Sequence, residues 1–516
     1  MARTNEISTD AETIAAAGMN TVRVALAFSL TERYVLILMA LGSNVLLARL
    51  LTPEQIGIFS VSLAVIAVAQ VFRDFGVGSY LIQEKNLTEL HVRTAFGVTL
   101  LIGATLFVSV WLGASWAANV YDEPRLISTL RVCSFNFLVL PFCTVSLALL
   151  RREMKFGHLA VVNVTATAAG LLVTLACVFR GMGEVSMAIG SVVTNVCTGL
   201  GSWAAHSRRA VFLPSLREWR AVARFGGQSS LSGVITSVSM DANDLFVAKI
   251  LSFQEAALLS RAQGLMSMLN RDVMAAVRGV ALPAFAAAHR AGEDVASQHQ
   301  RSIASFSVIA WPFYGLLALY SLEALRLLYG PQWDAARPAL AVFCAAGAVM
   351  AVTGLSPTLL VAVGRIDLVF RFDLVMQPLR LALIVGAALV YKDILACAIA
   401  LFVVACISVP VFRWMRGIAL PAHKSRIIST LGSSFVVVFV SLLPALLQSG
   451  LAGIWRTDPL PLFSILPILA ITVVLWSATA IAVKHPLTNE KLFCTLTSWP
   501  GRCWRGLAVR MRALFR

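Results

Sequence analysis

Residues 92–118 read VRTAFGVTLLIGATLFVSVWLGASWAA, and after Arg93 this stretch contains no charged side chain. About 20 consecutive apolar residues are enough for a helix to cross the hydrocarbon core of a bilayer. The stretch therefore predicts a membrane-spanning helix.

The whole chain of 516 residues has the same character. Its residues are 58% hydrophobic and only 13% charged, and its mean hydropathy is +0.81. Soluble domains carry about 25% charged residues, so the composition excludes a soluble enzyme, a secreted disulfide scaffold and a disordered chain. It predicts an all-α polytopic membrane protein.

Fourteen apolar segments, bounded by charges and turn residues, are the expected spans. The two most polar of them are the seventh and the eighth. The segments lie at 24–48, 55–78, 92–118, 126–149, 157–179, 184–206, 222–247, 253–277, 300–322, 337–363, 366–390, 393–412, 427–448 and 460–483.

The distribution of Lys and Arg predicts the orientation. With both termini cytoplasmic, 30 of the 42 Lys and Arg residues fall on the cytoplasmic side, nine fall on the other side and three fall within spans. Cytoplasmic loops of membrane proteins carry such an excess. Topology thus explains most of the net charge of +16, and no nucleic-acid partner is expected.

One sequence motif occurs twice, 200 residues apart. LARLLTPEQIGIFS (47–60) and VAKILSFQEAALLS (247–260) align without gaps, and each follows the first helix of a six-helix block. Six helices between copies give the two blocks one orientation, hence two six-helix lobes related by an axis along the membrane normal. The expected divisions are a cytoplasmic segment (1–23), the N-lobe (24–206), a basic linker (207–221), the C-lobe (222–416), two further helices (417–484) and a basic tail (485–516).

Ionisable residues inside spans are expensive to insert and are functional candidates by default. The seventh span is rich in them, and lipid cannot solvate these groups, so the helix is expected to face a wet cavity or another helix. The alternative is that the charges form buried pairs, such as Glu32 with Arg33 or Asp244 with Arg261. The candidate cavity residues are Glu32, Arg33, Gln228, Asp241, Asp244, Arg261 and Arg380.

Catalytic chemistry has little support in the sequence. The seven histidines are scattered at cytoplasmic ends and loops, the nine cysteines form no CxxC pair, and no GxxxxGK[ST] phosphate loop occurs. No expected external loop exceeds about 20 residues, which leaves no room for an external catalytic domain. The chain is expected to be a transporter that needs no metal or other cofactor.

The C-terminal stretch GRCWRGLAVRMRALFR (501–516) interleaves five arginines with apolar residues. Such a pattern suits a short helix on an anionic cytoplasmic leaflet. A frayed basic end that obeys the positive-inside rule is the other interpretation.

Eight short motifs follow one another over residues 20–420. They are LARLLTPEQIG (47–57), DFGVGSYLIQEKNLT (74–88), RREMKF (151–156), NDLFVAKILS (243–252), LLSRAQGL (258–265), VALPAF (280–285), YGPQW (329–333) and VGRIDL (363–368). In this order they resemble the polysaccharide transporter branch of the multidrug/oligosaccharidyl-lipid/polysaccharide exporter superfamily. Two positions depart from the family pattern: Ala248 replaces a usual glycine, and Asp241 adds an acid. The last hundred residues resemble the family only in hydropathy.

The resemblance implies a fourteen-helix bacterial inner-membrane flippase that works by alternating access. Its substrate would be an undecaprenyl-diphosphate-linked oligosaccharide, moved to the periplasmic leaflet for exopolysaccharide, capsule or lipopolysaccharide synthesis. Arg33, Arg261 and Arg380 would then contact phosphates or acidic sugars, while Asp241 and Asp244 would bind a coupling cation or sugar hydroxyls. A polysaccharide polymerase and chain-length or export proteins are the implied partners.

Three alternatives remain open. A multidrug or cation antiporter and a peptidoglycan-precursor flippase would share the fold. A membrane polysaccharide polymerase or ligase would need a sizeable external loop with catalytic Arg or His, and this chain lacks one.

Overall fold

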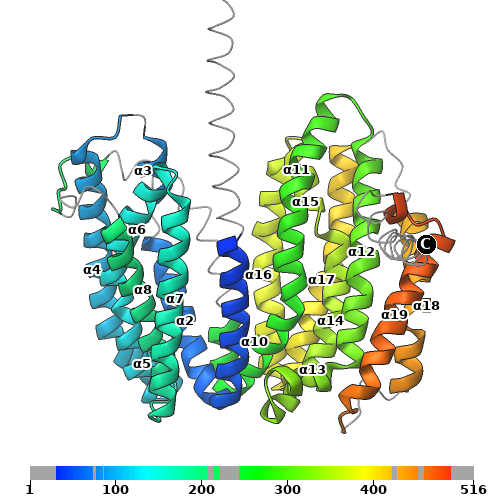
Figure 1. The fold of residues 1–516 in the computed structure, drawn as a ribbon, viewed down its shortest axis with the longest axis horizontal. Helices are drawn as coiled ribbons and strands as arrows, with labels where there is room; N and C mark the ends of the chain where they lie inside the picture. The colour runs from blue at the N-terminus through cyan, green and yellow to red at the C-terminus, as the bar shows by residue number, and fades with distance from the viewer. Residues whose placement is uncertain are drawn as a thin grey trace, which may run out of the picture. The chain divides into compact units, whose positions relative to one another are not determined.

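The computed structural model describes residues 31–73, 77–84, 86–205, 213–220, 243–420, 427–450 and 458–489. The described residues form helices and connecting turns, with no strand among them. The chain divides into two compact units, Met1–Ala257 (unit 1) and Leu258–Arg516 (unit 2), which Figure 1 colours from blue to green and from green to red. The division falls inside helix α10 (Phe253–Met268).

Unit 1 begins, in its described part, with a helix over Thr31–Leu50. A later helical stretch over residues 243–250 leads to α10. The helices between them are α2 (Pro53–Arg73), α3 (Val77–Gln83), α4 (Glu89–Tyr121), α5 (Arg125–Ser134), α6 (Asn136–Arg152), α7 (Phe156–Phe179) and α8 (Val185–Ala205).

Unit 2 continues α10 through a π-helical turn, η2 (Leu269–Val273), directly into α11 (Met274–Arg290). The remaining elements are α12 (Val295–Leu319), α13 (Ser321–Leu328), η3 (Pro331–Ala336), α14 (Arg337–Thr353), α15 (Ser356–Ala362), α16 (Ile366–Tyr391), α17 (Ile394–Ala419), α18 (Ile427–Ser449), α19 (Leu462–Ala482) and η5 (Pro486–Asn489).

Twelve helices in the described part are long and apolar enough to span a membrane. They correspond to twelve of the fourteen expected segments, and most ends differ by a few residues. The other two expected spans are the polar ones. Most of 222–247 lies outside the described residues, and 253–277 falls on α10, η2 and the start of α11, which do not reach the same hydropathy.

Both copies of the repeated motif build the same local structure. In the first copy a helix ends at Leu50 and the next begins at Pro53, where the Thr52 hydroxyl accepts the Gln55 N–H and the Gln55 side chain accepts the Thr52 N–H. In the second copy the Ser252 hydroxyl accepts the Glu255 N–H and donates to the Glu255 carboxylate. Each cap stabilises the start of the second helix of its copy. Each copy therefore contains one sharp break between two helices.

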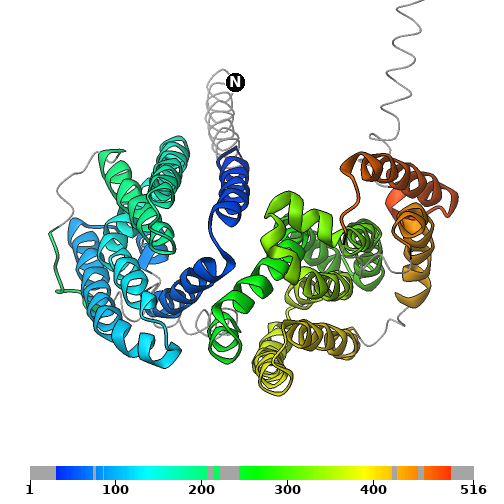
Figure 2. The ribbon, with the colours of Figure 1, turned by 90° about the horizontal axis from the view of Figure 1, so that it is seen from below.

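Helices α7 and α8 are joined by a short turn and pack closely side by side in unit 1 (Figure 2). The closest approach uses Gly170 and Thr174 on α7 and Gly190 and Thr194 on α8. Each threonine hydroxyl donates to the carbonyl of the glycine on its own helix, at 2.8 and 2.9 Å. Each also lies against the glycine of the other helix. Small residues at such crossings allow membrane helices to approach closely.

We expect Gly190→Ala to destabilise unit 1. A Cβ atom at residue 190 would lie 1.7 Å from the Thr174 Oγ1 atom, which its own hydrogen bond holds in place, and 2.9 Å from the Gly170 carbonyl oxygen. Overpacking of this kind costs about 1–3 kcal/mol. The apparent unfolding temperature of the purified protein in detergent measures the loss. Gly113→Ala is the control, because a Cβ there meets nothing within 4 Å. Equal unfolding temperatures for the two variants would contradict the close crossing.

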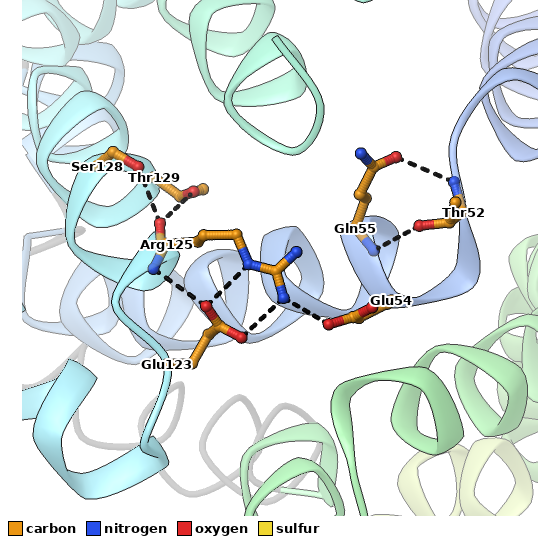
Figure 3. A network of polar contacts seen from close by, with 7 residues as sticks. All are labelled: Thr52, Glu54, Gln55, Glu123, Arg125, Ser128 and Thr129. Atoms are coloured by element: carbon orange, nitrogen blue, oxygen red, sulfur yellow. Dashed lines mark hydrogen bonds and ion pairs between the residues drawn. The ribbon is translucent and has the colours of Figure 1, made fainter. Parts of the chain in front are cut away.

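A polar network joins α2 to the α4–α5 connection (Figure 3). The Arg125 guanidinium donates to the Glu54 carboxylate on α2 and, at 2.8 Å, to both oxygens of Glu123. One residue earlier in the chain, Asp122 pairs with Lys249 at 3.1 Å. The network therefore ties the first copy of the repeated motif to the α4–α5 turn, and Lys249 ties the second copy to the same turn.

Stability is expected to depend on pH through Glu123. Hydrogen bonds from Arg125 hold the pKa of the Glu123 carboxyl below its usual value of 4.5. A depressed pKa in the folded state means stabilisation that is fully present above pH 4.5 and is lost as the pH falls through the folded pKa. Glu123→Gln should thus lower stability by about 0.5–1 kcal/mol at pH 7 and by much less at pH 3.5. A thermal unfolding series of both proteins tests this, and a difference independent of pH would contradict it.

Helices α18 and α19 pair with each other, and α18 packs on α12 (Figure 2). Polar contacts fasten them: the Tyr320 hydroxyl donates to Gln448 at 2.7 Å, and the Trp476 indole N–H donates to the Val308 carbonyl at 2.8 Å. The buried Glu323 carboxylate on α13 accepts the Leu460 N–H, just before α19. The last two spans are therefore fixed parts of unit 2.

Candidate functional site

The structure describes five of the seven candidate cavity residues. Glu32, Arg33 and Asp244 lie in unit 1, and Arg261 and Arg380 lie in unit 2. Gln228 and Asp241 lie outside the described residues, as do residues 1–30 and the tail from residue 490. The predicted amphipathic tail is therefore not among the described elements.

Glu32 and Arg33 follow each other on the first helix but have different surroundings. The Glu32 carboxylate accepts a hydrogen bond of 2.6 Å from the Asn163 side chain on α7. Arg33 is exposed. Few residues of this helix are buried. The expected Glu32–Arg33 pair is thus replaced by a contact between two helices.

Asp244 belongs to the helical stretch 243–250, which packs against the end of α4. The Tyr121 hydroxyl donates to the Leu245 carbonyl at 3.0 Å, and the Tyr121 ring contacts the Phe253 ring at 5.8 Å between centroids. Asn243 is buried and Asp244 is half-buried. This part of the NDLFVAKILS motif is therefore anchored on unit 1 through its backbone and its aromatic neighbour.

Arg261 lies two turns into α10, among aromatic side chains. Its guanidinium carbon is 5.7 Å from the ring centroid of Tyr329 and 5.7 Å from that of Trp333. Both rings are buried in unit 2. Within about 6 Å, a cation over an aromatic face is attracted by the ring quadrupole. The structure thus joins two of the sequence motifs, LLSRAQGL and YGPQW, in one contact.

Arg380 lies in the middle of α16 and is half-buried. Asp373 and Gln377 precede it by seven and three residues, a spacing that places all three side chains on one face of the helix. Pro378 lies inside α16 beside them, and it has no N–H to donate to the Leu374 carbonyl one turn earlier. This face of α16 is therefore a polar stripe inside an otherwise apolar span.

Sequence reasoning missed Asp373 and Gln377, although the signal was available. A carboxylate in a span, four and seven residues from other polar groups, has the spacing of one helix face. Asp373 was overlooked because it lies nearer the end of its segment than Arg380 does. The structure adds these two residues to the candidate site as neighbours of Arg380 on the same helix.

The spans of unit 2 carry more cationic than anionic charge. Helices α11, α14, α15 and α17 contain no Asp or Glu, and α11 and α17 each contain arginines. In α16, one of the described spans of this unit, the Asp373 carboxylate lies within two turns of Arg380. This excess of positive charge suits an anionic ligand better than a cationic one. Among the described residues, no group of three or more His, Cys, Asp and Glu side chains is placed to hold a metal ion.

Comparison with known sequences gives consistent matches. Residues 46–338 match the model of a family described as polysaccharide biosynthesis protein. The chain is 24% identical over 343 residues to the lipopolysaccharide biosynthesis protein WzxC of Escherichia coli (strain K12), with 66% of this chain and 69% of WzxC covered. It is 20% identical over 374 residues to the teichuronic acid biosynthesis protein TuaB of Bacillus subtilis (strain 168), covering 72% and 77%. The succinoglycan biosynthesis transport protein ExoT of Rhizobium meliloti (strain 1021) is 25% identical over 296 residues, covering 57% and 60%.

Comparison with solved structures shows the fold. The lipid II flippase MurJ in an inward closed conformation matches with a TM-score of 0.69 and 13% identity, over 89% of this chain and 99% of MurJ. An inward-facing multidrug resistance transporter of the MATE family in the MOP superfamily matches with a TM-score of 0.58 and 15% identity, over 75% and 96%. The predicted all-α, multi-pass membrane architecture is confirmed.

Proposed function

The chain belongs to the polysaccharide biosynthesis protein family that its residues 46–338 match, and we propose that it is a flippase for lipid-linked oligosaccharides. The substrate is an undecaprenyl-diphosphate-linked repeat unit, which the protein moves to the outer leaflet of the bacterial inner membrane by alternating access. The observation that carries this proposal is the match to three relatives named for polysaccharide biosynthesis, one of them as a transport protein.

The charges in the spans support an anionic, membrane-embedded substrate. A diphosphate cannot cross hydrocarbon without compensating charge, and an arginine in a wet cavity lowers that cost. Arg33, Arg261 and Arg380 contact the phosphates or acidic sugars in this proposal. Asp241 and Asp244 bind a coupling cation or sugar hydroxyls.

The remaining polar candidates form hydrogen bonds with the sugar. Glu32, held by Asn163, and Gln228 offer hydrogen-bonding groups of the kind that recognise hydroxyls. The protein acts as a transporter and not as an enzyme.

The orientation follows from the positive-inside rule, with both termini cytoplasmic. The basic tail lies on the anionic inner leaflet. The flipped repeat units pass to a polymerase and to chain-length or export proteins on the other side. These partners are inferred from the reaction sequence, since a repeat unit on the outer leaflet has to be polymerised.

A deletion strain is expected to lose surface polymer and to accumulate the lipid-linked oligosaccharide on the cytoplasmic leaflet. Extraction of polyprenyl-linked lipids, combined with leaflet-selective labelling of their sugars, measures both effects. The matched control is the same strain complemented with the wild-type gene.

Other outcomes identify the alternatives. Changed resistance to toxic cations with intact polymer would contradict the proposal and favour an antiporter. Failure to obtain a viable deletion, with peptidoglycan precursor trapped on depletion, would favour a peptidoglycan-precursor flippase. Trapped repeat units on the outer leaflet would favour a polymerase or ligase.

A further inference from the structure

Two basic side chains of unit 2 are buried with donors that reach no acceptor. His299, in the second turn of α12, is 1% exposed, and neither of its ring nitrogens has a hydrogen-bond partner among the described residues. Arg416, in the last turn of α17, is 6% exposed, and its Nη1 atom has no such partner either. The two side chains belong to one site, because the Arg416 charge acts on the His299 imidazole.

Both groups need an acceptor, and Arg416 needs a negative charge as well. An imidazole carries at least one N–H, and a guanidinium carries five donors and no acceptor. A buried unpaired charge is more costly than a buried unsatisfied donor, and a water molecule would not neutralise it. No described carboxylate acts on Arg416, and residues 394–457 include no Asp or Glu. An anion is therefore the ligand that satisfies both side chains.

Packing fixes the imidazole in place. Its ring meets the ring of Phe285 on α11 edge to face, with 5.9 Å between the centroids and 73° between the planes. Phe285 is itself 1% exposed. An aromatic pair of this geometry sets the ring orientation as well as burying area. The His299 donor is thus held in one direction before any ligand binds.

A third basic residue connects this pair with the surface. Arg413 precedes Arg416 by three residues, so the two lie on one face of α17, and Arg413 is exposed. Their like charges repel each other at this spacing. An anion bound between them would turn this repulsion into attraction to a shared ligand. The basic groups therefore run inward from exposed Arg413 to buried Arg416 and His299.

The three residues lie at the depth of lipid headgroups. His299 follows the start of α12 by four residues and Arg416 precedes the end of α17 by three, which is about 5–6 Å at 1.5 Å per residue. Trp414 beside them is 64% exposed, and tryptophan is enriched at the membrane–water interface. The orientation predicted from the sequence places these helix ends on the cytoplasmic side, where the leaflet carries anionic lipids.

We propose that Arg413, Arg416 and His299 bind the phosphate group of an anionic membrane lipid at this end of unit 2. Arg413 attracts the headgroup, Arg416 neutralises the phosphate through charge-assisted hydrogen bonds, and His299 donates to a second phosphate oxygen. The bound lipid links α12 to α17. This site does not depend on which substrate the protein transports, and it is separate from the basic tail.

Lipid binding to purified, delipidated full-length protein in detergent tests the proposal. The variants are Arg416→Met and His299→Phe, which keep much of the side-chain volume and remove the donors. Arg301→Met is the matched control, because Arg301 is exposed on α12 two residues after His299 and donates to the Ser297 hydroxyl. The probes are dioctanoyl phosphatidylglycerol, dioctanoyl phosphatidylcholine and inorganic phosphate. Calorimetric titration gives the dissociation constant, and thermal unfolding is measured with and without each probe. The basic tail is the same in every protein.

The wild-type protein should bind phosphatidylglycerol about tenfold or more tightly than phosphatidylcholine, and its unfolding temperature should rise on binding. Arg416→Met weakens phosphatidylglycerol binding about tenfold or more and His299→Phe about fivefold, while Arg301→Met changes it less than about twofold. Without lipid, Arg416→Met and His299→Phe unfold at the wild-type temperature or above it, because each removes a buried donor that has no acceptor.

Three results would overturn the proposal. The first is equal affinity of the wild-type protein for the two lipids, or an equal loss in Arg301→Met and Arg416→Met. The second is a lower unfolding temperature of both lipid-free variants, which would show that protein groups already satisfy these side chains. The third is stabilisation by inorganic phosphate at the same concentration as phosphatidylglycerol, which would replace the lipid by a free ion. None of these results depends on translocation, so a failure of the proposed function is seen separately.

Discussion

Replacement of Arg380 by alanine should abolish polymer export while the amount of folded protein in the membrane stays normal. Arg380 lies half-buried in the middle of α16, on the polar face that it shares with Asp373 and Gln377. In the proposed function Arg380 contacts a phosphate or an acidic sugar, and loss of such a charged contact costs about 2–5 kcal/mol, so transport should fall by about 30-fold or more. The measurement is surface polymer per cell, normalised to the protein level in membranes.

The same helix supplies the controls for this substitution. Arg371 is exposed on α16, and Arg371→Ala should leave export close to the wild-type value. Arg380→Lys keeps the charge and should retain part of the activity. Loss of folded protein in Arg380→Ala, rescued by a partner substitution on a neighbouring helix, would assign Arg380 a structural role and contradict its place in the site.

Replacement of Gly57 by alanine should have the largest structural effect in unit 1. Gly57 ends the first LARLLTPEQIG motif, and an added Cβ atom would lie 2.0 Å from the backbone oxygen of Phe253 and 2.6 Å from its carbonyl carbon. Backbone cannot move aside as a side-chain tip can, so the start of α10 would have to shift away from α2. A cost above the usual range of about 1–3 kcal/mol is expected.

The apparent unfolding temperature and the yield of monodisperse protein measure this cost. Gly42→Ala on the first span is the control, because a Cβ atom at residue 42 meets nothing within 4 Å. Gly57→Ala with wild-type yield and unfolding temperature would contradict the close contact between the two copies of the motif.

Much of the fold follows from the apolar segments of the sequence. The stretch 92–118 predicts a span that the structure places at Glu89–Tyr121, and 366–390 corresponds to Ile366–Tyr391. Such agreement is expected, because the hydrocarbon thickness sets helix length directly. The polar segments 222–247 and 253–277 gave weaker predictions, since a helix that faces a cavity or another helix has no uniform hydropathy.

The contacts between helices were less predictable. Hydropathy marks Arg261 as unusual, and the YGPQW motif stands out in the sequence, but nothing in their spacing of some 70 residues indicates that they meet. The same holds for Glu32 and Asn163, on the first helix and on α7. Helix-to-helix pairing depends on packing in three dimensions, and local periodicity does not record it.

The repeated motif is less predictable from sequence than the spans and more predictable than the contacts between helices. Its alignment at an offset of 200 residues predicted equivalent places in the two blocks, and the caps at Thr52 and Ser252 now give that alignment a physical reason. A hydroxyl residue followed three positions later by Gln or Glu is a capping signature that sequence alone contains. This capping signature predicts both helix breaks to the residue.

The central claim is translocation of a lipid-linked oligosaccharide, and purified protein in proteoliposomes tests it most directly. Vesicles are loaded symmetrically with an undecaprenyl-diphosphate-linked oligosaccharide, and an added glycosidase then trims only the outer leaflet. With the wild-type protein, trimming should proceed past about one half of the substrate to near completion, while empty vesicles and Arg380→Ala vesicles stop near one half. Trimming that stops near one half with the wild-type protein as well would contradict the account.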